Sequence, residues 1–363
     1  IFCAENLDND SLWGEWYDVG SGENISLNEL KEIVLQYLPE QSFEYVEERK
    51  GDVLLTRADL SKFDQHGWKP EKNLIVGLNN IYSKLSMEID NIGIVGNGFV
   101  GSAVAYGFSP QCGYDANIRI YDKQQEKSNS SLGETVNESD FIFLSVPTPS
   151  NQDGSIHLGV IETALDEINE AKIDTRKKNV VLIRSTVVPG TTRKLAKKYW
   201  RLALVFNPEF LTERSAKFDF INQSRFIIGG LTHTPEIPRW EVSAVARLFK
   251  HRFGESTPVV MCDYETAEII KYMNNCFFAL KVSFLNEMKM LADKSSVDWD
   301  IAVDGFVRDG RVGHSHLQVP GPDGKLGFGG SCFPKDLRAI IQFGEENDVD
   351  MKTLKAAWET NLE

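Results

Sequence analysis

One cysteine stands in a sequence setting that suits covalent chemistry. Cys332 follows the glycine-rich run Gly327–Gly330, and Phe-Pro, Lys335 and Asp336 come directly after it. Glycine lets a backbone approach a ligand closely, because it has no side chain and tolerates positive φ. A helix predicted to begin at Lys335 would point its N-terminal amides at the sulfur and favour the nucleophilic thiolate. The run therefore predicts a cysteine nucleophile with a cation and a carboxylate close behind it.

Two further groups of polar residues precede this run. Glu209 and Glu213 lie four residues apart in a predicted loop, close enough to act on one substrate or water. Lys271 and Asn275 occupy positions i and i+4 of a helix predicted over residues 266–287, so they share one face. A solvated lysine is the alternative, but the surrounding residues are largely apolar. The residues expected in the core of this helix are Cys276, Phe277, Phe278 and Phe284.

A glycine motif predicts a dinucleotide site. A strand predicted over residues 89–95 runs into Gly96-Asn-Gly98-Phe-Val-Gly101. In this motif the first glycine makes the tight turn, the second admits a pyrophosphate, and the third lets helix approach strand. The next predicted strand ends on Asp122, whose carboxylate can bind the adenosine ribose hydroxyls and would repel a 2′-phosphate. We therefore expect NAD rather than NADP, with Lys123 next door weakening that preference slightly.

More strands predict the elements that position these groups. Apolar strands over residues 140–146 and 179–183 run into loops that contain Thr148 and Thr186, and a further strand precedes Glu209. In open parallel sheets, ligands bind at the carboxyl ends of the strands. Repeated strand–loop–helix units predict an α/β fold, a Rossmann-type doubly wound parallel sheet followed by an all-helical domain.

Composition argues against several classes of function. The chain has 363 residues, with 39 basic and 53 acidic side chains and a net charge of −14. This negative charge argues against binding of nucleic acid and against binding to anionic membranes. No apolar run is long enough to span a bilayer. The five cysteines are scattered and form no CxxC, which is typical of a reducing compartment, so we expect a cytoplasmic protein. His314 and His316 lack carboxylate or thiolate neighbours, so no metal site is expected.

The first 85 residues carry separate signals. Ser26 and Glu29 have the spacing of a capping box and predict a helix start. Spaced phrases, including Arg49-Lys-Gly-Asp52, resemble the C-terminal substrate-binding part of extended short-chain dehydrogenase nucleotide-sugar epimerases and dehydratases. The resemblance implies that Arg49 and Asp52 would hold a nucleotide diphosphate and ribose. No tyrosine has a lysine four residues later, so epimerase catalysis is not expected, and a packing segment left by a fusion is the favoured interpretation.

With these motifs assembled, residues 89–363 resemble the UDP-glucose/GDP-mannose 6-dehydrogenase family. The motifs that carry the resemblance are Gly96–Gly101, Val146–Pro149, Ser185–Pro189, Asn207–Glu213, Lys271 with Asn275, Gly310–Gly313 and Gly327–Asp336. The resemblance implies two successive NAD-dependent oxidations of a sugar C6 alcohol to a carboxylate. The segment Ser331–Asp336 looks more like the UDP-glucose branch than the N-acetylmannosamine branch, with the GDP-mannose branch as the alternative.

The resemblance also implies catalytic roles. Cys332 would attack the aldehyde to give a thiohemiacetal, whose oxidation gives a thioester that water hydrolyses. Lys271 and Asn275 would stabilise the oxyanion, and Asp336 would position the water or act as base. Water binding and proton transfer would fall to Thr186 and Glu209.

Binding contacts follow from the same motif matches. The implied cofactor contacts are Gly96, Gly98, Phe99, Val100, Gly101, Asp122, Lys123, Val146, Pro147, Thr148, Thr186 and Lys335. The implied substrate contacts are Glu209, Phe210, Leu211, Glu213, Lys271, Asn275, Arg311, Phe328 and Gly329. Arg311 would reach the substrate phosphates of a neighbouring subunit, which implies a homodimer built on the central helix.

The chain departs from the family pattern in two places. Between Asp122 and Asp140 the family has a longer helical excursion, and here only a few polar residues are expected. After Trp358 the family continues into a second Rossmann-like domain that binds much of the UDP, so the uridine pocket is expected to lack most of one wall. The intact catalytic set favours an active UDP-glucose 6-dehydrogenase. The alternatives are a GDP-mannose 6-dehydrogenase and a non-catalytic module that binds NAD or dimerises.

Three parts are expected along the chain. Residues 1–86 would be a small epimerase-like α+β appendage. Residues 87–220 would be the NAD-binding Rossmann domain, whose sheet could extend to about residue 262. Residues 263–363 would be a helical central domain that carries the cysteine loop and forms the dimer.

Overall fold

The chain forms two compact units, Ile1–Glu88 and Ile89–Glu363. The computed structural model describes residues 26–37, 43–44, 59–65, 69, 90–173, 178–234 and 237–362. Among these residues no helix is both long and apolar enough to cross a membrane.

A seven-stranded sheet in the order β2-β1-β3-β4-β5-β6-β9 is the centre of the second unit. Its first five strands are parallel: β1 (Asn91–Val95), β2 (Asn117–Tyr121), β3 (Phe141–Leu144), β4 (Val180–Ile183) and β5 (Ala203–Phe206). β6 (Phe226–Gly229) is antiparallel to β5, and β9 (Val259–Cys262) is parallel to β6. A separate hairpin pairs β7 (Thr232–Thr234) with β8 (Ile237–Pro238). The chain order reverses at β1, which lies between β2 and β3, and this is the point where doubly wound sheets bind ligands.

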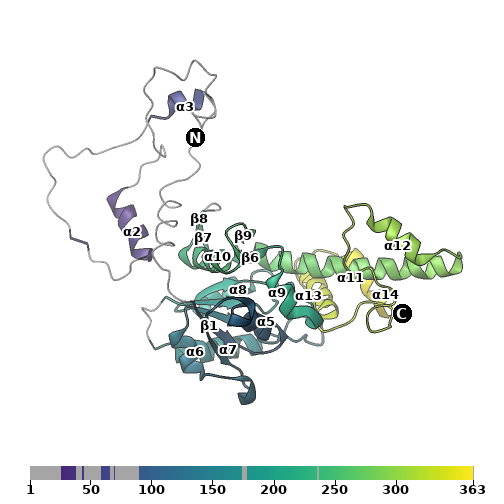
Figure 1. Cartoon of the computed structure of the whole chain (residues 1–363), viewed down its shortest axis with the longest axis horizontal. Coiled ribbons are helices and arrows are strands. Elements are labelled where there is room, and N and C mark those ends of the chain that lie inside the picture. The colour runs from purple at the N-terminus through teal and green to yellow at the C-terminus, as the bar shows by residue number, and fades with distance from the viewer. Residues whose placement is uncertain are drawn as a thin grey trace. The chain divides into compact units, whose positions relative to one another are not determined.

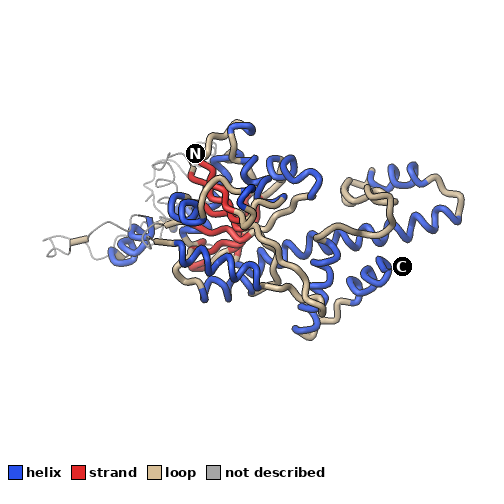
Figure 2. Tube along the Cα trace, turned by 90° about the horizontal axis from the view of Figure 1, so that it is seen from below, coloured by secondary structure: helices blue, strands red, loops and turns tan. Residues whose placement is uncertain are grey.

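Helices cover both faces of this sheet, and Figure 2 shows the strands between two helical layers. One face is covered by α5 (Phe99–Gly107), α9 (Ala216–Ile221) and α10 (Trp240–Phe253), which share a core with Ile92, Ile94 and Phe143. The other is covered by α7 (Gly159–Ala171), α8 (Thr191–Lys198) and the start of α11. Strands buried on both faces need continuous apolar runs, which β1, β3 and β4 have. The expected α/β Rossmann-type sheet is confirmed.

A helical domain follows the last strand. α11 (Tyr264–Lys294) has 31 residues, and Figure 1 shows it projecting away from the sheet. The Asp263 side chain caps its start by accepting a hydrogen bond from the Thr266 amide at 2.7 Å. The other helices of this domain are α12 (Trp299–Val307), α13 (Phe333–Glu346) and α14 (Lys352–Leu362). The helical domain expected after the sheet is therefore present, and α13 and α14 pack on α11 around Tyr272 and Leu337.

Two expectations about local structure are wrong. Phe277 and Phe284, expected in the core, are 58% and 48% exposed, because the core-facing side of α11 is defined by α13 and α14. The segment between Asp122 and Asp140 is more than a few polar residues. It holds α6 (Leu132–Glu138), which begins with a capping box between Ser131 and Glu134 and buries Val136.

The N-terminal unit contains two described helices. α2 (Leu27–Tyr37) starts as predicted, with the Ser26 amide donating to Glu29 at 2.8 Å and the Glu29 amide donating to the Ser26 hydroxyl at 3.1 Å. The second, α3 (Ser61–Gln65), follows Asp59, whose carboxylate accepts from the Ser61 amide. Arg49 and Asp52 lie outside the described residues.

Candidate active site

A buried ion pair joins the helical domain to the sheet. Lys271 of α11 donates to the Glu209 carboxylate at 2.9 Å and to the Glu209 carbonyl at 2.6 Å. Both side chains are almost fully buried, at 2% and 4% exposure. Glu209 follows β5, and its second carboxylate oxygen accepts the Leu211 amide at 2.7 Å. The predicted Lys271 face and the predicted Glu209 loop therefore meet.

Opposite charges hold this pair ionised. Burial opposes the charge of Glu209, but the Lys271 ammonium, the hydrogen bonds and the Arg184 guanidinium together lower the pKa of the Glu209 carboxyl. Burial likewise opposes the charge of Lys271, but Glu209 and Asp336 raise the pKa of its ammonium. The pair therefore fixes a cation and an anion in a buried environment of low dielectric constant, where electrostatic interactions are strong.

A second polar group lies one turn along α11. Asn275 donates to one oxygen of the Asp336 carboxylate at 2.6 Å, and Lys335 donates to the other at 2.5 Å. Asp336 is 1% exposed and belongs to the first turn of α13. The predicted Asn275 and Asp336 therefore meet, and the Lys335 ammonium points at Asp336, although it was expected at the cofactor.

Cys332 is the residue at the N-cap of α13, which begins two residues earlier than predicted. Its sulfur is half-buried and lies 3.7 Å from the Ser331 hydroxyl. The expectation of a favoured thiolate is wrong: burial, with the carboxylates of Glu209 and Asp336, raises the pKa of the Cys332 thiol, and Ser331 and Lys271 oppose this only in part. With its pKa raised, the Cys332 side chain stays a thiol at neutral pH.

The loops after β3 and β4 are tied together beside this group. The Ser185 hydroxyl donates to the Val146 carbonyl at 2.6 Å and accepts from the Val146 amide at 3.2 Å. The Thr148 hydroxyl donates to the Thr186 carbonyl at 3.1 Å, and both threonines are buried. Two loops predicted separately therefore form one surface at the carboxyl edge of the sheet.

The glycine loop between β1 and α5 has the shape expected of a dinucleotide site. A Cβ at Gly101 would lie 2.0 Å from the Gly96 carbonyl oxygen, so the helix can pack this close only with glycine. A Cβ at Gly98 would meet nothing within 4 Å, which leaves room for a pyrophosphate over the helix start. Asp122 accepts from the Asn97 amide at 2.7 Å and stays beside the loop. Lys123 pairs with Glu167 of α7 at 3.3 Å.

These glycines make a matched pair of variants. Gly98→Ala should leave the thermal midpoint unchanged and weaken NAD binding by about tenfold or more, because its methyl enters open space that the pyrophosphate needs. Gly101→Ala should instead lower stability by roughly 2 kcal/mol, because its methyl collides with the Gly96 backbone. Calorimetric titration with NAD and thermal unfolding check both. A Gly98→Ala protein that binds NAD as tightly as wild type would contradict the assignment.

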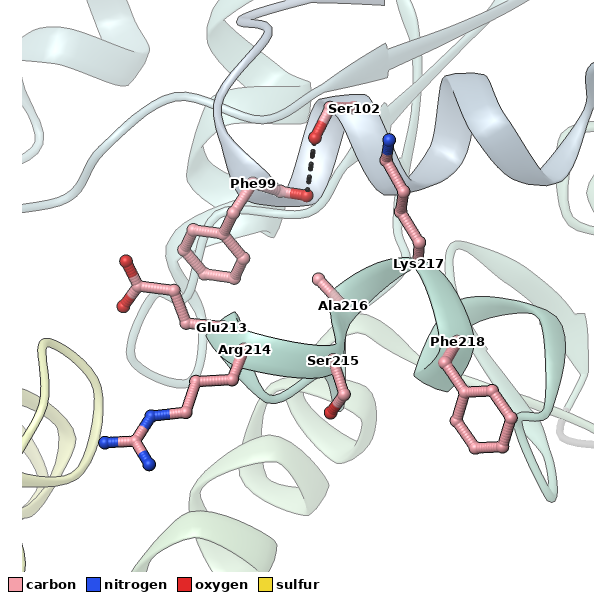
Figure 3. A pocket seen from close by; sticks show the side chains of 8 residues that line it. All are labelled: Phe99, Ser102, Glu213, Arg214, Ser215, Ala216, Lys217 and Phe218. Carbon is pink, nitrogen blue, oxygen red and sulfur yellow. Dashed lines mark hydrogen bonds between the residues drawn. The ribbon is translucent and has the colours of Figure 1, made fainter. Parts of the chain in front are cut away.

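A hollow of about 400 Å³ opens beside the glycine loop. Figure 3 shows its lining: α5 supplies Phe99 and Ser102, and the segment Glu213–Phe218 supplies the rest. An expected cofactor residue, Phe99, and an expected substrate residue, Glu213, therefore line one space. The Lys271–Glu209 pair and Cys332 are not among its lining residues.

The remaining expected substrate residues have mixed positions. The Phe210 ring lies 5.5 Å from the Lys271 ammonium, so it borders the ion pair. Phe328 is 5% exposed, with its ring against Trp358 and its amide donating to Asn361 at 2.6 Å. Arg311 has an exposed side chain that pairs with Asp309 at 2.5 Å.

Two buried side chains that support the site have no role in the sequence-based prediction. Arg184 follows β4 and donates to Asn207, and burial lowers the pKa of its guanidinium to about 10. Glu268 accepts from the amides of Gly190 and Thr192, fastening the Thr186 loop to α11, and burial raises its pKa to about 7. A charge directly after an apolar strand was a signal for Arg184. Glu268 lies one turn before Lys271 on α11, and that spacing was its signal.

A Rossmann-type sheet with a dinucleotide glycine loop, joined to a helical domain that brings a cysteine, a buried lysine and carboxylates together, is typical of NAD-dependent dehydrogenases. Residues 118–252 match the NAD-binding domain of the UDP-glucose/GDP-mannose dehydrogenase family, and residues 265–363 match its central domain. A UDP-glucose 6-dehydrogenase of Haloferax volcanii is 31% identical over 306 residues, which cover 74% of this chain and 69% of that protein. The chain belongs to the UDP-glucose/GDP-mannose dehydrogenase family.

Other similar proteins support the same family membership. A UDP-glucose 6-dehydrogenase of Bacillus subtilis is 30% identical over 64% of this chain and 48% of its own length. The solved structure of a UDP-glucose dehydrogenase from Pyrobaculum islandicum superposes with a TM-score of 0.63 at 29% identity, covering 76% of this chain and 68% of that one. The chain spans about half the length of several curated relatives that it matches.

Proposed function

We propose that the chain is an NAD-dependent UDP-glucose 6-dehydrogenase that converts UDP-glucose, two NAD⁺ and water into UDP-glucuronate and two NADH. The observation that carries the proposal is a set of two buried pairs, Lys271–Glu209 and Asn275–Asp336, whose charges act on each other and on the Cys332 thiol. Family membership supplies the substrate class, and GDP-mannose is the alternative substrate. NAD held at the glycine loop would accept the hydride in each oxidation.

The geometry supports a division of labour among the protein side chains. Addition of the Cys332 sulfur to the aldehyde carbon forms a C–S bond, gives up the thiol proton and places negative charge on the aldehyde oxygen. Lys271 has three N–H donors and gives two to Glu209, which leaves one for that oxygen. Asn275 lies one turn away on the same face and would donate the second hydrogen bond. After hydride loss, water attacks the thioester carbon, and the thiol is released with the proton that returns to sulfur.

Proton transfer would fall to the carboxylates. Asp336 would position the hydrolytic water or accept its proton, and Glu209 with Thr186 would hold the water and pass protons on. The loop contacts of Thr148 and Ser185 keep Thr186 at the carboxyl edge of the sheet, where water and substrate would meet. Residues 87–262 would thus form the cofactor domain and residues 263–363 the catalytic helical domain.

The deciding experiment counts products. Purified chain with UDP-glucose and NAD should yield two NADH per UDP-glucuronate, with no reduction of NADP at equal concentration. Oxidation of GDP-mannose but not UDP-glucose would move the assignment to the alternative. No oxidation of either sugar nucleotide, with NAD binding intact by calorimetry, would leave a non-catalytic NAD-binding module.

We also propose a homodimer built on α11. Met273, Phe277, Phe284, Met288 and Leu291 are 40–65% exposed, and their spacing places them on one narrow stripe of that helix. A self-complementary apolar stripe suits a second copy of the same helix. Sedimentation should therefore give a dimer for wild type and a monomer for Phe277→Glu. A monomeric wild type would overturn the proposal.

The scattered free cysteines Cys112, Cys262, Cys276 and Cys332 support a cytoplasmic location.

For the N-terminal unit, we propose kinship with the substrate-binding part of nucleotide-sugar epimerases, supported by its motifs alone. A packing role is favoured over a binding role. The binding role predicts that Arg49→Ala raises KM for the sugar nucleotide and leaves NAD binding unchanged. An unchanged KM would leave the packing role.

A further inference from the structure

Lys281 is a buried lysine whose ammonium is bound by backbone oxygens. It lies on α11 at 9% exposure, and its Nζ donates to the carbonyl oxygens of Val312, Gly313 and Ser315 at 3.3, 2.9 and 2.7 Å. An ammonium has three N–H donors, so these three acceptors can occupy all of them. Ordering a loop costs conformational entropy, and hydrogen bonds from a charged donor are strong enough to offset part of it.

The same turn of α11 holds the loop at a second point. The His316 ring stacks on Phe278, with ring centroids 4.1 Å apart and planes 17° apart. Its other aromatic neighbour is Phe333, at 5.4 Å, the residue directly after Cys332. Burial and the nearby Lys281 charge lower the pKa of His316, so the ring is neutral at pH 7 and can lie beside the ammonium. His316 Nδ1 is buried without a partner among the described residues, so the ring is held by stacking.

This double attachment begins one residue after Arg311. The Arg311 side chain is 88% exposed, and its ion pair with Asp309 is a surface pair of the kind that contributes little to stability. The guanidinium is therefore available to a stronger anion, while the backbone that carries it is fixed at Val312. Arginine binds phosphate oxygens well because its planar fork offers paired donors.

We propose that Lys281 is a positioning residue: it fastens the loop Gly310–His316 to α11 so that Arg311 is presented to the diphosphate of a sugar nucleotide. Through His316 and Phe333, the same fastening links the phosphate-binding loop to the residue beside the Cys332 nucleophile. The identity of the anion rests on the proposed function, whereas the fastening of the loop does not. The two parts can therefore be tested separately.

Limited trypsin digestion tests the fastening without any need for activity. Lys281→Met keeps the length of the side chain and removes the ammonium, and Lys281→Arg keeps the charge and the donors. Cleavage after Arg311 should become about tenfold faster or more in Lys281→Met, because that bond must leave the α11 surface to be cut. Cleavage after the exposed Lys325 is the internal control and should not change. Lys281→Arg should be cut at Arg311 close to the wild-type rate, and a wild-type rate in Lys281→Met would overturn the proposal.

Calorimetric titration tests the presentation of Arg311. In the whole 363-residue chain, Lys281→Met should bind UDP-glucose about tenfold more weakly or worse and bind NAD as wild type does, and Lys281→Arg should recover most of the UDP-glucose affinity. Faster cleavage with unchanged UDP-glucose affinity would overturn the link to the ligand. A wild-type protein that binds neither UDP-glucose nor GDP-mannose would sink the proposed function, and the digestion result would still decide whether Lys281 holds the loop.

Discussion

Replacing Cys332 with alanine should abolish formation of UDP-glucuronate, with a loss of at least about a thousandfold in turnover. In the proposed reaction, loss of the sulfur removes the thiohemiacetal that would hold the aldehyde between the two hydride transfers, and the thioester that water would hydrolyse. The measurement is the yield of UDP-glucuronate and of NADH over many enzyme equivalents. Cys276→Ala is the matched control, because Cys276 is a buried α11 cysteine whose pKa is raised to about 12, and its loss should spare activity.

The pH dependence of thiol alkylation gives an independent check of Cys332. Because burial and the charges of Glu209 and Asp336 raise its pKa, iodoacetamide should inactivate the enzyme slowly at pH 7. The inactivation rate should still be climbing at about pH 10, where an ordinary thiol with a pKa of about 8.5 is almost fully ionised and its rate has levelled off. Glu209→Gln removes one of the negative charges and should move the curve to lower pH.

For the alanine variant, formation of UDP-glucuronate at even a tenth of the wild-type rate would contradict the assignment of Cys332 as the nucleophile.

Local patterns explain why much of the site could be predicted from the sequence. Lys271 and Asn275 share a face because helical periodicity alone sets it, and the glycine spacing at Gly96–Gly101 is likewise a local property. The five parallel strands were visible as apolar runs, and β2 ends at Tyr121 directly before Asp122 as predicted. Each of these features depends only on residues that are close to one another in the sequence.

What the sequence could not give depends on residues far apart in the chain. The pKa of Cys332 is raised first by burial and then by the charge of Glu209, which follows β5, so a rule based only on the start of its own helix gave the wrong direction. The exposure of Phe277 and Phe284 was misjudged because an apolar stripe on a helix has the same sequence pattern whether it is buried in a core or left exposed. The carbonyl oxygens that bind Lys281 come from the loop after α12, and the lysine's own neighbours in the sequence do not predict these contacts.

Replacing Lys271 with methionine should both lower the stability of the protein and strongly reduce its turnover. Glu209 would be left as a carboxylate at 4% exposure without its ammonium partner, and removing one member of a buried ion pair costs about 3–5 kcal/mol. Loss of the proposed oxyanion donor should lower turnover by a further factor of about 100 to 1,000 in the protein that remains folded. Urea unfolding measures the first effect, and initial rates at a temperature where the variant is folded measure the second.

The sign of the pH dependence distinguishes this account from simple loss of packing. In wild type the lowered pKa of Glu209 contributes stability that is present above the unfolded-state pKa and is lost as pH falls through the folded-state value. In Lys271→Met, burial prevails and raises the Glu209 pKa, so the carboxyl can be neutralised by mild acid. The stability deficit should therefore be large at pH 8 and shrink towards pH 5. Adding Glu209→Gln should recover part of the deficit at pH 8, because the unpaired charge is gone. A deficit independent of pH, with no recovery in the double variant, would mean that Lys271 acts through packing of its stem alone.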